Sequence, residues 1–282
     1  MQLKRIFVII LVITNFSCQS QSKENSEKEK PLDFKGLLVA IREQKIAPGK
    51  AKKEFSRIMK ELHEQYKPAS YDSLSMDLVF PLRTKNYKDV GGRGRGFYAR
   101  HFDLFDHSVA KSHPAHDIFI YDLDHDCKDD NTGEYVDILA VNRGVVIATE
   151  TEWTEENGYK GGNYVWLYDF ESGGLWYYAH QRKVYALEGQ IVEQGDKIGE
   201  VGRSGFNAER NRSDTHLHLM FLKMDEDFKP TAVNHYPWLK KARTVYTTQL
   251  PKHRPRKTIE ATALKARQPF LLGNSFPLKS GL

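Results

Sequence analysis

The chain has 282 residues, of which 40% are hydrophobic and 12% aromatic. This composition can bury a sizeable core and excludes a chain that is disordered throughout. The formal net charge is +5, and it falls to +3 if Lys4 and Arg5 are removed with the amino-terminal segment. This charge is too small to indicate a strongly basic binding surface, so we expect no nucleic-acid partner.

Residues 1–17 have the three parts of an export signal. Two basic residues precede an apolar run over residues 6–13, and Ser17 stands directly before Cys18. The run is too short for a membrane-spanning helix. A cysteine in this place resembles the lipidation site of a bacterial lipoprotein, although Asn15 stands where that pattern has leucine.

This signal peptide predicts an exported protein of the cell envelope. We expect a periplasmic-side lipoprotein of the outer membrane, bound to the membrane through a lipid anchor on Cys18. The alternatives are an uncleaved anchor and a signal that is cut elsewhere. Residues 18–31 are polar and lack aromatics, so they predict a flexible tether. Cys127 then has no disulfide partner within the chain.

Residues 32–75 have helical periodicity. Apolar residues recur at helix spacing in two stretches, and a proline stands at the first turn of the second. These residues are Phe34, Leu37, Leu38 and Ile41, then Pro48, Ala51, Phe55, Ile58, Leu62 and Tyr66. We predict a helical hairpin whose apolar faces pack on each other or on the following domain, with no chemical role.

Residues 76–224 change to short β-rich runs separated by Gly, Asn and Asp turns. Examples are DILAV, GVVIAT, NYVWLYDF, LWYYAH and HLHLMFL. Near residues 184–205, glycines punctuate alternating apolar residues at tight-turn spacing, which predicts successive hairpins. The predicted fold is mainly β: a compact antiparallel β sandwich of duplicated, lipoyl-like hairpins with an amino-terminal helical hairpin.

Residues 225–282 form a basic extension interrupted by prolines. From Lys229 onward, Glu260 is its single acidic residue. A solvated tail is one interpretation, and attraction to anionic polymers of the cell wall or membrane is the other. We expect the apolar cluster of Tyr236, Trp238 and Leu239 to dock on the domain and much of the rest to be irregular.

The segment THLHLMF is the strongest local signal for a site. Residues two apart in a β-strand point to the same face, so His216 and His218 would project together. Leu217, Leu219 and Phe221 would then face the core. Two imidazoles lining one cavity are suited to metal binding.

Two further segments supply candidate residues. His113 and Asp117 of HPAHDIFI are four apart and share a face in a strand or a helix, and both are suitable zinc ligands. His180 ends the aromatic run WYYAH, where it can reach over a neighbouring site. A single histidine is more often a surface or hydrogen-bonded residue than a ligand, but the three segments in this order form a specific combination.

The order of these motifs resembles the lysostaphin-type (LytM-like) peptidoglycan zinc metallopeptidases. The pattern of that family runs His-x-x-x-Asp, Tyr-x-His and His-x-His, and the resemblance covers roughly residues 80–222. Ala115 stands where the first motif usually has glycine. The resemblance implies one Zn²⁺ per chain held by His113, Asp117 and His218, with His180 and His216 as unligated catalytic histidines.

Three protein ligands leave one zinc coordination position open, as catalysis requires. A zinc ion held in this way lowers the pKa of water enough for attack on a peptide carbonyl at neutral pH. The two histidines could then accept a proton, stabilise the oxyanion or protonate the leaving amine. No His-Glu-x-x-His motif is present, so a glutamate base is not supported.

An acidic segment, YDLDHDCKDDNTGEY, follows the first motif. The spacing of Asp122, Asp124 and Asp126 is similar to that of a calcium loop. However, Cys127 occupies the position that requires glycine, and Gly133 the position that requires glutamate. We interpret the segment as a solvated acidic loop near the substrate groove.

These features predict a zinc-dependent endopeptidase that cuts peptide cross-links of peptidoglycan. The alternative is a non-catalytic scaffold of the same fold that binds peptidoglycan or activates another hydrolase. A weaker alternative is a carrier or sugar-phosphotransfer module, suggested by the lipoyl-like VEQGDKIGEVG. No modified-lysine turn accompanies that segment, and the export signal argues against it.

Overall fold

The computed structural model describes residues 33–68, 77–106, 112–209 and 213–246. The expected signal peptide, the tether and the lipid anchor on Cys18 lie outside these residues, as does the chain beyond residue 246. No helix in the described ranges combines the length and the hydropathy that a membrane span requires.

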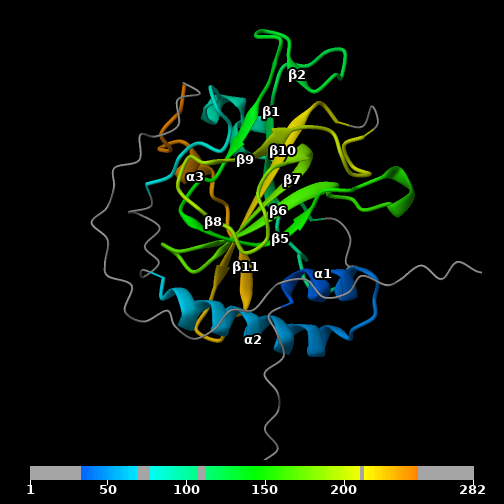
Figure 1. Ribbon diagram of the computed structural model, residues 1–282, viewed down its shortest axis with the longest axis vertical. Helices are drawn as coiled ribbons and strands as arrows, with labels where there is room; N and C mark the ends of the chain where they lie inside the picture. The colour runs from blue at the N-terminus through cyan, green and yellow to red at the C-terminus, as the bar shows by residue number, and fades with distance from the viewer. Residues whose placement is uncertain (1–32, 69–76, 107–111, 210–212, 247–282) are drawn as a thin grey trace, which may run out of the picture.

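Two helices open the described chain, α1 (Phe34–Arg42) and α2 (Pro48–Tyr66) (Figure 1). Asp33 caps α1 because its side chain accepts a hydrogen bond from the backbone N–H of Gly36 at 2.7 Å. Pro48 begins α2, at a position where a backbone N–H would have no partner within the helix, so the missing N–H of proline costs no hydrogen bond. The apolar faces of both helices are buried and the helices contact each other, so the predicted helical hairpin is confirmed.

One antiparallel sheet of nine strands makes up most of the domain. Its order is β1-β10-β7-β6-β5-β8, with β11 beside β10 and with β9 beside β7 and β4. The strands are β1 (Ala115–Phe119), β4 (Asp137–Leu139), β5 (Gly144–Glu150), β6 (Asn163–Asp169), β7 (Leu175–Val184), β8 (Ile191–Val192), β9 (Lys197–Val201), β10 (His216–Met224) and β11 (Pro230–Ala232). A separate pair is formed by β2 (Lys128–Asp129) and β3 (Glu134–Tyr135). The predicted mainly antiparallel β fold with two amino-terminal helices is confirmed.

Each face of the sheet carries its own hydrophobic core. Leu217, Leu219 and Phe221 of β10 point into the first core, which also contains residues of β4 and β9. Met220 and Leu222 point to the opposite face, into the core that the helices α1 and α2 cover. This alternation follows from the two-residue period of a strand, and it makes the helices part of the packed domain.

The glycine-rich run at β8 and β9 pairs differently from the predicted hairpins. Strand β8 lies beside β5, whereas β9 lies beside β4 and β7. The turn between them contains Gly195, whose φ is +88° and whose N–H donates to the carbonyl of Ala140 at 2.8 Å. The predicted turn is present, but its two strands pair with distant segments and not with each other.

The chain after β10 also packs against the domain. Strand β11 pairs with β10, and a short helix, α3 (Tyr236–Leu239), buries Trp238 and Leu239, so the predicted docking of this cluster is confirmed. Arg243 then forms a parallel bridge to Val79 near the start of the domain. The division of the chain at residues 75 and 224 stays a prediction.

Candidate metal centre

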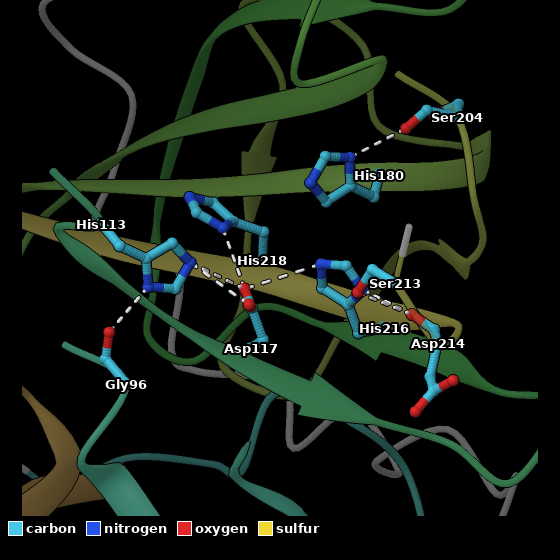
Figure 2. Close-up of polar contacts among 9 residues, drawn as sticks. All are labelled: Gly96, His113, Asp117, His180, Ser204, Ser213, Asp214, His216 and His218. Carbon is cyan, nitrogen blue, oxygen red and sulfur yellow. Dashed lines mark hydrogen bonds and ion pairs between the residues drawn. The ribbon is translucent and has the colours of Figure 1, made fainter. Parts of the chain in front are cut away.

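Strands β1, β10 and β7 bring the five predicted site residues to one place. Asp117 of β1 lies opposite His218 of β10, and His216 stands two residues earlier on the same face. His113 precedes β1, and His180 lies on β7, the other neighbour of β10. Figure 2 shows the five side chains converging over the sheet.

Asp117 is at the centre of this group. Its Oδ1 lies 3.0 Å from Nδ1 of His218, 3.2 Å from Nε2 of His113 and 3.6 Å from Nε2 of His216. Burial by itself would raise the pKa of Asp117, but the hydrogen bonds from His113 and His218 outweigh burial and hold that pKa well below its usual range. Asp117 is therefore an anion at neutral pH, as a metal-binding carboxylate must be.

His113 is oriented to face a cation. Its Nδ1 lies 2.9 Å from the carbonyl oxygen of Gly96, and a carbonyl only accepts, so Nδ1 carries the proton. In the neutral ring, Nε2 then turns a lone pair toward the carboxylate of Asp117. Two acceptors at this distance need a cation between them. A proton can be that cation, and the hydrogen bond it makes to Asp117 raises the pKa of His113. A metal ion with N and O ligands can take the same place.

His180 and His216 are held as neutral imidazoles. The Nδ1 of His180 donates to the carbonyl of Ser204 at 2.8 Å, and the Nδ1 of His216 donates to the carbonyl of Asp214 at 2.7 Å (Figure 2). Nε2 of each ring is left with a free lone pair. Burial lowers the pKa of both histidines, so each ring is unprotonated at pH 7.

The backbone of His180 has an unusual conformation. Its φ is +62°, in the left-handed region, although the residue lies within a strand. This conformation costs a residue other than glycine about 1–2 kcal/mol. The N–H of His180 donates to the carbonyl of Gly161 at 2.9 Å, so both its backbone and its ring are held by neighbouring loops. Local strain of this kind is typical of functional sites.

Three groups of three residues in the described ranges bring metal-ligating atoms within 4.8 Å of one another; Asp122, Asp124 and Asp130 form one in the acidic segment, and the other two lie at this site. One is His113, Asp117 and His218, and the other is His180, His216 and His218. The side chains of the first group are 35%, 24% and 19% exposed, whereas that of His216 is 4% exposed. A catalytic zinc needs an open position, which favours the first group. The division into three ligands and two catalytic residues stays a prediction.

Two further features lie beside the site. His116, next to Asp117, points to the opposite face of β1, and its Nε2 lies 2.9 Å from Oδ1 of Asn234. Asp122 of the acidic segment is buried, not solvated, because it accepts hydrogen bonds from the backbone N–H of Cys127 and the hydroxyl of Thr215. That carboxylate therefore stabilises the loop.

The groups that orient the histidines were missed in the sequence. They are the carbonyls of Gly96, Ser204 and Asp214, and every residue type has a carbonyl, so no sequence signal marks them. Phe119 was also missed, although its ring centroid lies 5.3 Å from that of His216. Its position two residues after Asp117, on the same face of the strand, could have indicated it.

Residues 124–230 match the model of peptidase family M23. This part of the chain belongs to that family. The match includes His180, His216 and His218 but begins after His113 and Asp117. The M23 match and the histidine cluster within it confirm the predicted enzyme class, a zinc metallopeptidase, for this part of the chain.

No curated protein matches the chain. Among solved structures, the M23 domain is similar to the catalytic domain of the antimicrobial peptidase lysostaphin from Staphylococcus simulans, with 22% identity over 46% of this chain and 80% of that one and a TM-score of 0.32. The antimicrobial peptidase lysostaphin from Staphylococcus simulans is 20% identical over 56% of this chain and 52% of its own, with a TM-score of 0.34. A zinc-containing peptidase from Vibrio cholerae is 20% identical over 61% of this chain and 41% of its own, with a TM-score of 0.34. The chain therefore spans less than two thirds of these last two proteins.

Proposed function

We propose that the protein is a zinc-dependent endopeptidase that hydrolyses peptide cross-links of bacterial peptidoglycan in the cell envelope. The observation that carries this proposal is the convergence of His113, Asp117 and His218 with two neutral histidines on one face of an M23 domain.

His113, Asp117 and His218 would hold one zinc ion per chain. Two imidazoles and a carboxylate suit zinc, and the facing acceptors of His113 and Asp117 require a cation. When bound, zinc supplies a Lewis acid that polarises the scissile carbonyl and lowers the pKa of water. The partial exposure of the three side chains leaves room for a substrate carbonyl.

His180 and His216 would carry out the proton transfers. Their Nδ1 atoms are engaged by carbonyls, so Nε2 is the atom that can take a proton from water or give one to the leaving amine. Their ring centroids are 4.8 Å apart, which lets both reach the same peptide bond. A protonated ring beside the carbonyl would also stabilise the developing oxyanion.

The location in the envelope rests on residues 1–17 and on Cys18. The export signal and the cysteine that follows it support an exported, periplasmic-side lipoprotein of the outer membrane. The partners would then be peptidoglycan peptides and the membrane that holds the lipid anchor. Cys18→Ser should release the protein from the membrane fraction if the anchor is correct.

The endopeptidase activity can be tested on purified muropeptides of several cross-link types. The zinc-loaded full chain should release cleaved products that mass spectrometry identifies. His180→Ala should keep its zinc but lose turnover, while His63→Ala, on the exposed side of α2, should behave as wild type. A zinc-loaded wild type that cleaves none of the cross-links would instead support a non-catalytic peptidoglycan-binding scaffold.

A further inference from the structure

A pocket lies at the edge of the sheet beside the metal centre. It has a volume of about 650 Å³ and is formed by the end of β1 and by two short helical turns, η1 (Tyr87–Asp89) and η2 (Gly91–Gly94). Val90, which joins the turns, bridges Ile118 on the edge of β1 that faces away from β10. The pocket therefore continues the floor of the site beyond its outermost strand.

Basic side chains dominate the lining of this pocket. They are Lys85, Lys88, Arg93 and Arg95, with Asp89 as the single acidic residue of the lining. Asp89 is already engaged by the backbone N–H of Asn86, and Lys85 pairs with Asp129. Across the part of the chain that the structure describes, no carboxylate forms an ion pair with Lys88 or Arg93. Positive charge gathered in a concave site attracts an anion.

The turn that carries Arg93 is held firmly. Gly94 has a φ of +79° and is buried under Tyr236, whose ring atoms would lie 2.3 Å from a Cβ placed at that glycine. The N–H of Arg93 donates to the carbonyl of Val90 at 3.2 Å. The cationic pocket is thus formed before a ligand binds, which lowers the entropic cost of binding.

Phe119 separates the pocket from the metal centre. Its ring lines the pocket and lies 5.3 Å, between centroids, from the ring of His216. Gly91 approaches Phe119 from the other side so closely that a Cβ would lie 2.7 Å from the ring. Only one side chain therefore lies between the pocket and a proposed catalytic histidine.

We propose that this pocket binds an oxyanion of the cell-wall polymer, a carboxylate or a phosphate, while the scissile peptide lies over the metal centre. The proposal rests on the endopeptidase function proposed above. An arginine guanidinium binds such a group through two parallel hydrogen bonds, and a lysine adds a point charge. The pocket would select polymers that carry a negative group on the β1 side of the cleaved bond.

The test uses the zinc-loaded full chain and the double variant Lys88→Gln/Arg93→Gln. The matched control is Lys50→Gln/Lys53→Gln, which removes two exposed cations of α2. Binding and cleavage are measured separately on muropeptides with free carboxylates and on the same muropeptides after amidation, with inorganic phosphate as a competitor. We expect the pocket variant to lose about tenfold in affinity for the carboxylate form, equal to about 1.4 kcal/mol, with kcat unchanged.

The outcomes separate the two sources of the anion. If amidation weakens binding to the wild type but not to the pocket variant, the ligand is a carboxylate. If amidation has no effect and phosphate competes only with the wild type, the ligand is a phosphate. Equal binding of every ligand by the pocket variant and the control would overturn the proposal. Loss of cleavage in the wild type, with the binding contrast intact, would count against the endopeptidase function alone.

Discussion

His218 belongs to both groups of candidate zinc ligands, so substitutions at the other positions distinguish the groups. We expect His113→Ala to lower zinc affinity by more than about 100-fold, because it removes a direct ligand. Losing a residue that only hydrogen-bonds a ligand already costs about 10- to 100-fold. His180→Ala should retain the metal. Zinc content after dialysis measures both, with His63→Ala as the control. The reverse pattern would assign the zinc to His180, His216 and His218.

The left-handed backbone of His180 also predicts how substitutions there change the stability of the fold. Asparagine tolerates this conformation, whereas a β-branched residue does not. His180→Val should therefore unfold more easily than His180→Asn by about 1–2 kcal/mol. Denaturant unfolding of the metal-free variants measures this difference. Equal stability would mean that the loops move to relieve the strain.

Four of the five candidate site residues could be found from the sequence because strand periodicity relates them locally in two pairs. His216 and His218 are two apart, and His113 and Asp117 are four apart, so each pair shares a face wherever the strand lies. The strained φ of His180 left no such signal. The conformation depends on carbonyls of Gly161 and Ser204, which are brought near only by tertiary structure.

At the scale of elements, α1 is connected to the site through one side chain. The guanidinium carbon of Arg42, the last residue of α1, lies 3.2 Å from the ring centroid of Tyr159 in the β5–β6 loop. The carbonyl of Tyr159 accepts a hydrogen bond from the indole N–H of Trp153, and Gly161 of the same loop holds the backbone of His180. The end of α1 therefore fixes the loop that positions a proposed catalytic histidine.

Arg42→Ala should loosen this loop. The loss of a cation–π contact of this kind is worth about 0.5–2 kcal/mol, so amide exchange in residues 153–163 should accelerate and kcat should fall. Arg42→Lys is the matched control, since it keeps the charge but not the planar stacking, and it should be intermediate. Unchanged exchange in both variants would show that α1 supports only the core.

Elements differed in how far the sequence predicted them. The helices were predicted because their stripes and Pro48 are local signals. The partners of β8 and β9 were not, since a glycine turn marks where a strand ends but does not specify which distant strand it joins. The basic pocket was also missed, because it needs a turn near Arg93 and a strand end at Phe119 that meet only in the fold.

At the scale of the whole molecule, zinc should stabilise the fold. Strand β10 carries His218 on one face and core residues on the other, so a metal ion held there stabilises a strand that packs in both cores. Zinc at about 1,000 times its Kd would add about 4 kcal/mol. Thermal unfolding with zinc and with a chelator measures the difference. His218→Ala should abolish it, and a zinc effect that persists in that variant would contradict the site.

Acid should destabilise the whole domain through His235, which is not one of the five site residues but packs on His116, with 4.8 Å between the ring centroids. Burial lowers the pKa of His235 to about 3, from an ordinary 6.5, so the folded chain keeps this ring neutral while the unfolded chain protonates it. The contribution of neutral His235 to the free energy of unfolding is complete above pH 6.5. It falls by about 1.4 kcal/mol for each pH unit below that, until the pH nears 3. In chelator, His235→Gln should lose about 2 kcal/mol less than wild type between pH 7 and pH 5. Identical losses would refute this role.

Strand β10 also constrains how this chain can vary in length. A single inserted or deleted residue inside it would turn Leu217, Leu219 and Phe221 toward the groove and the histidines into the core. A two-residue change would preserve the faces but bring His218 to the place of His216. Over evolutionary time, insertions and deletions are therefore expected to accumulate in the segments on either side of β10, and relatives should share its residue count even where the surrounding loops differ in length.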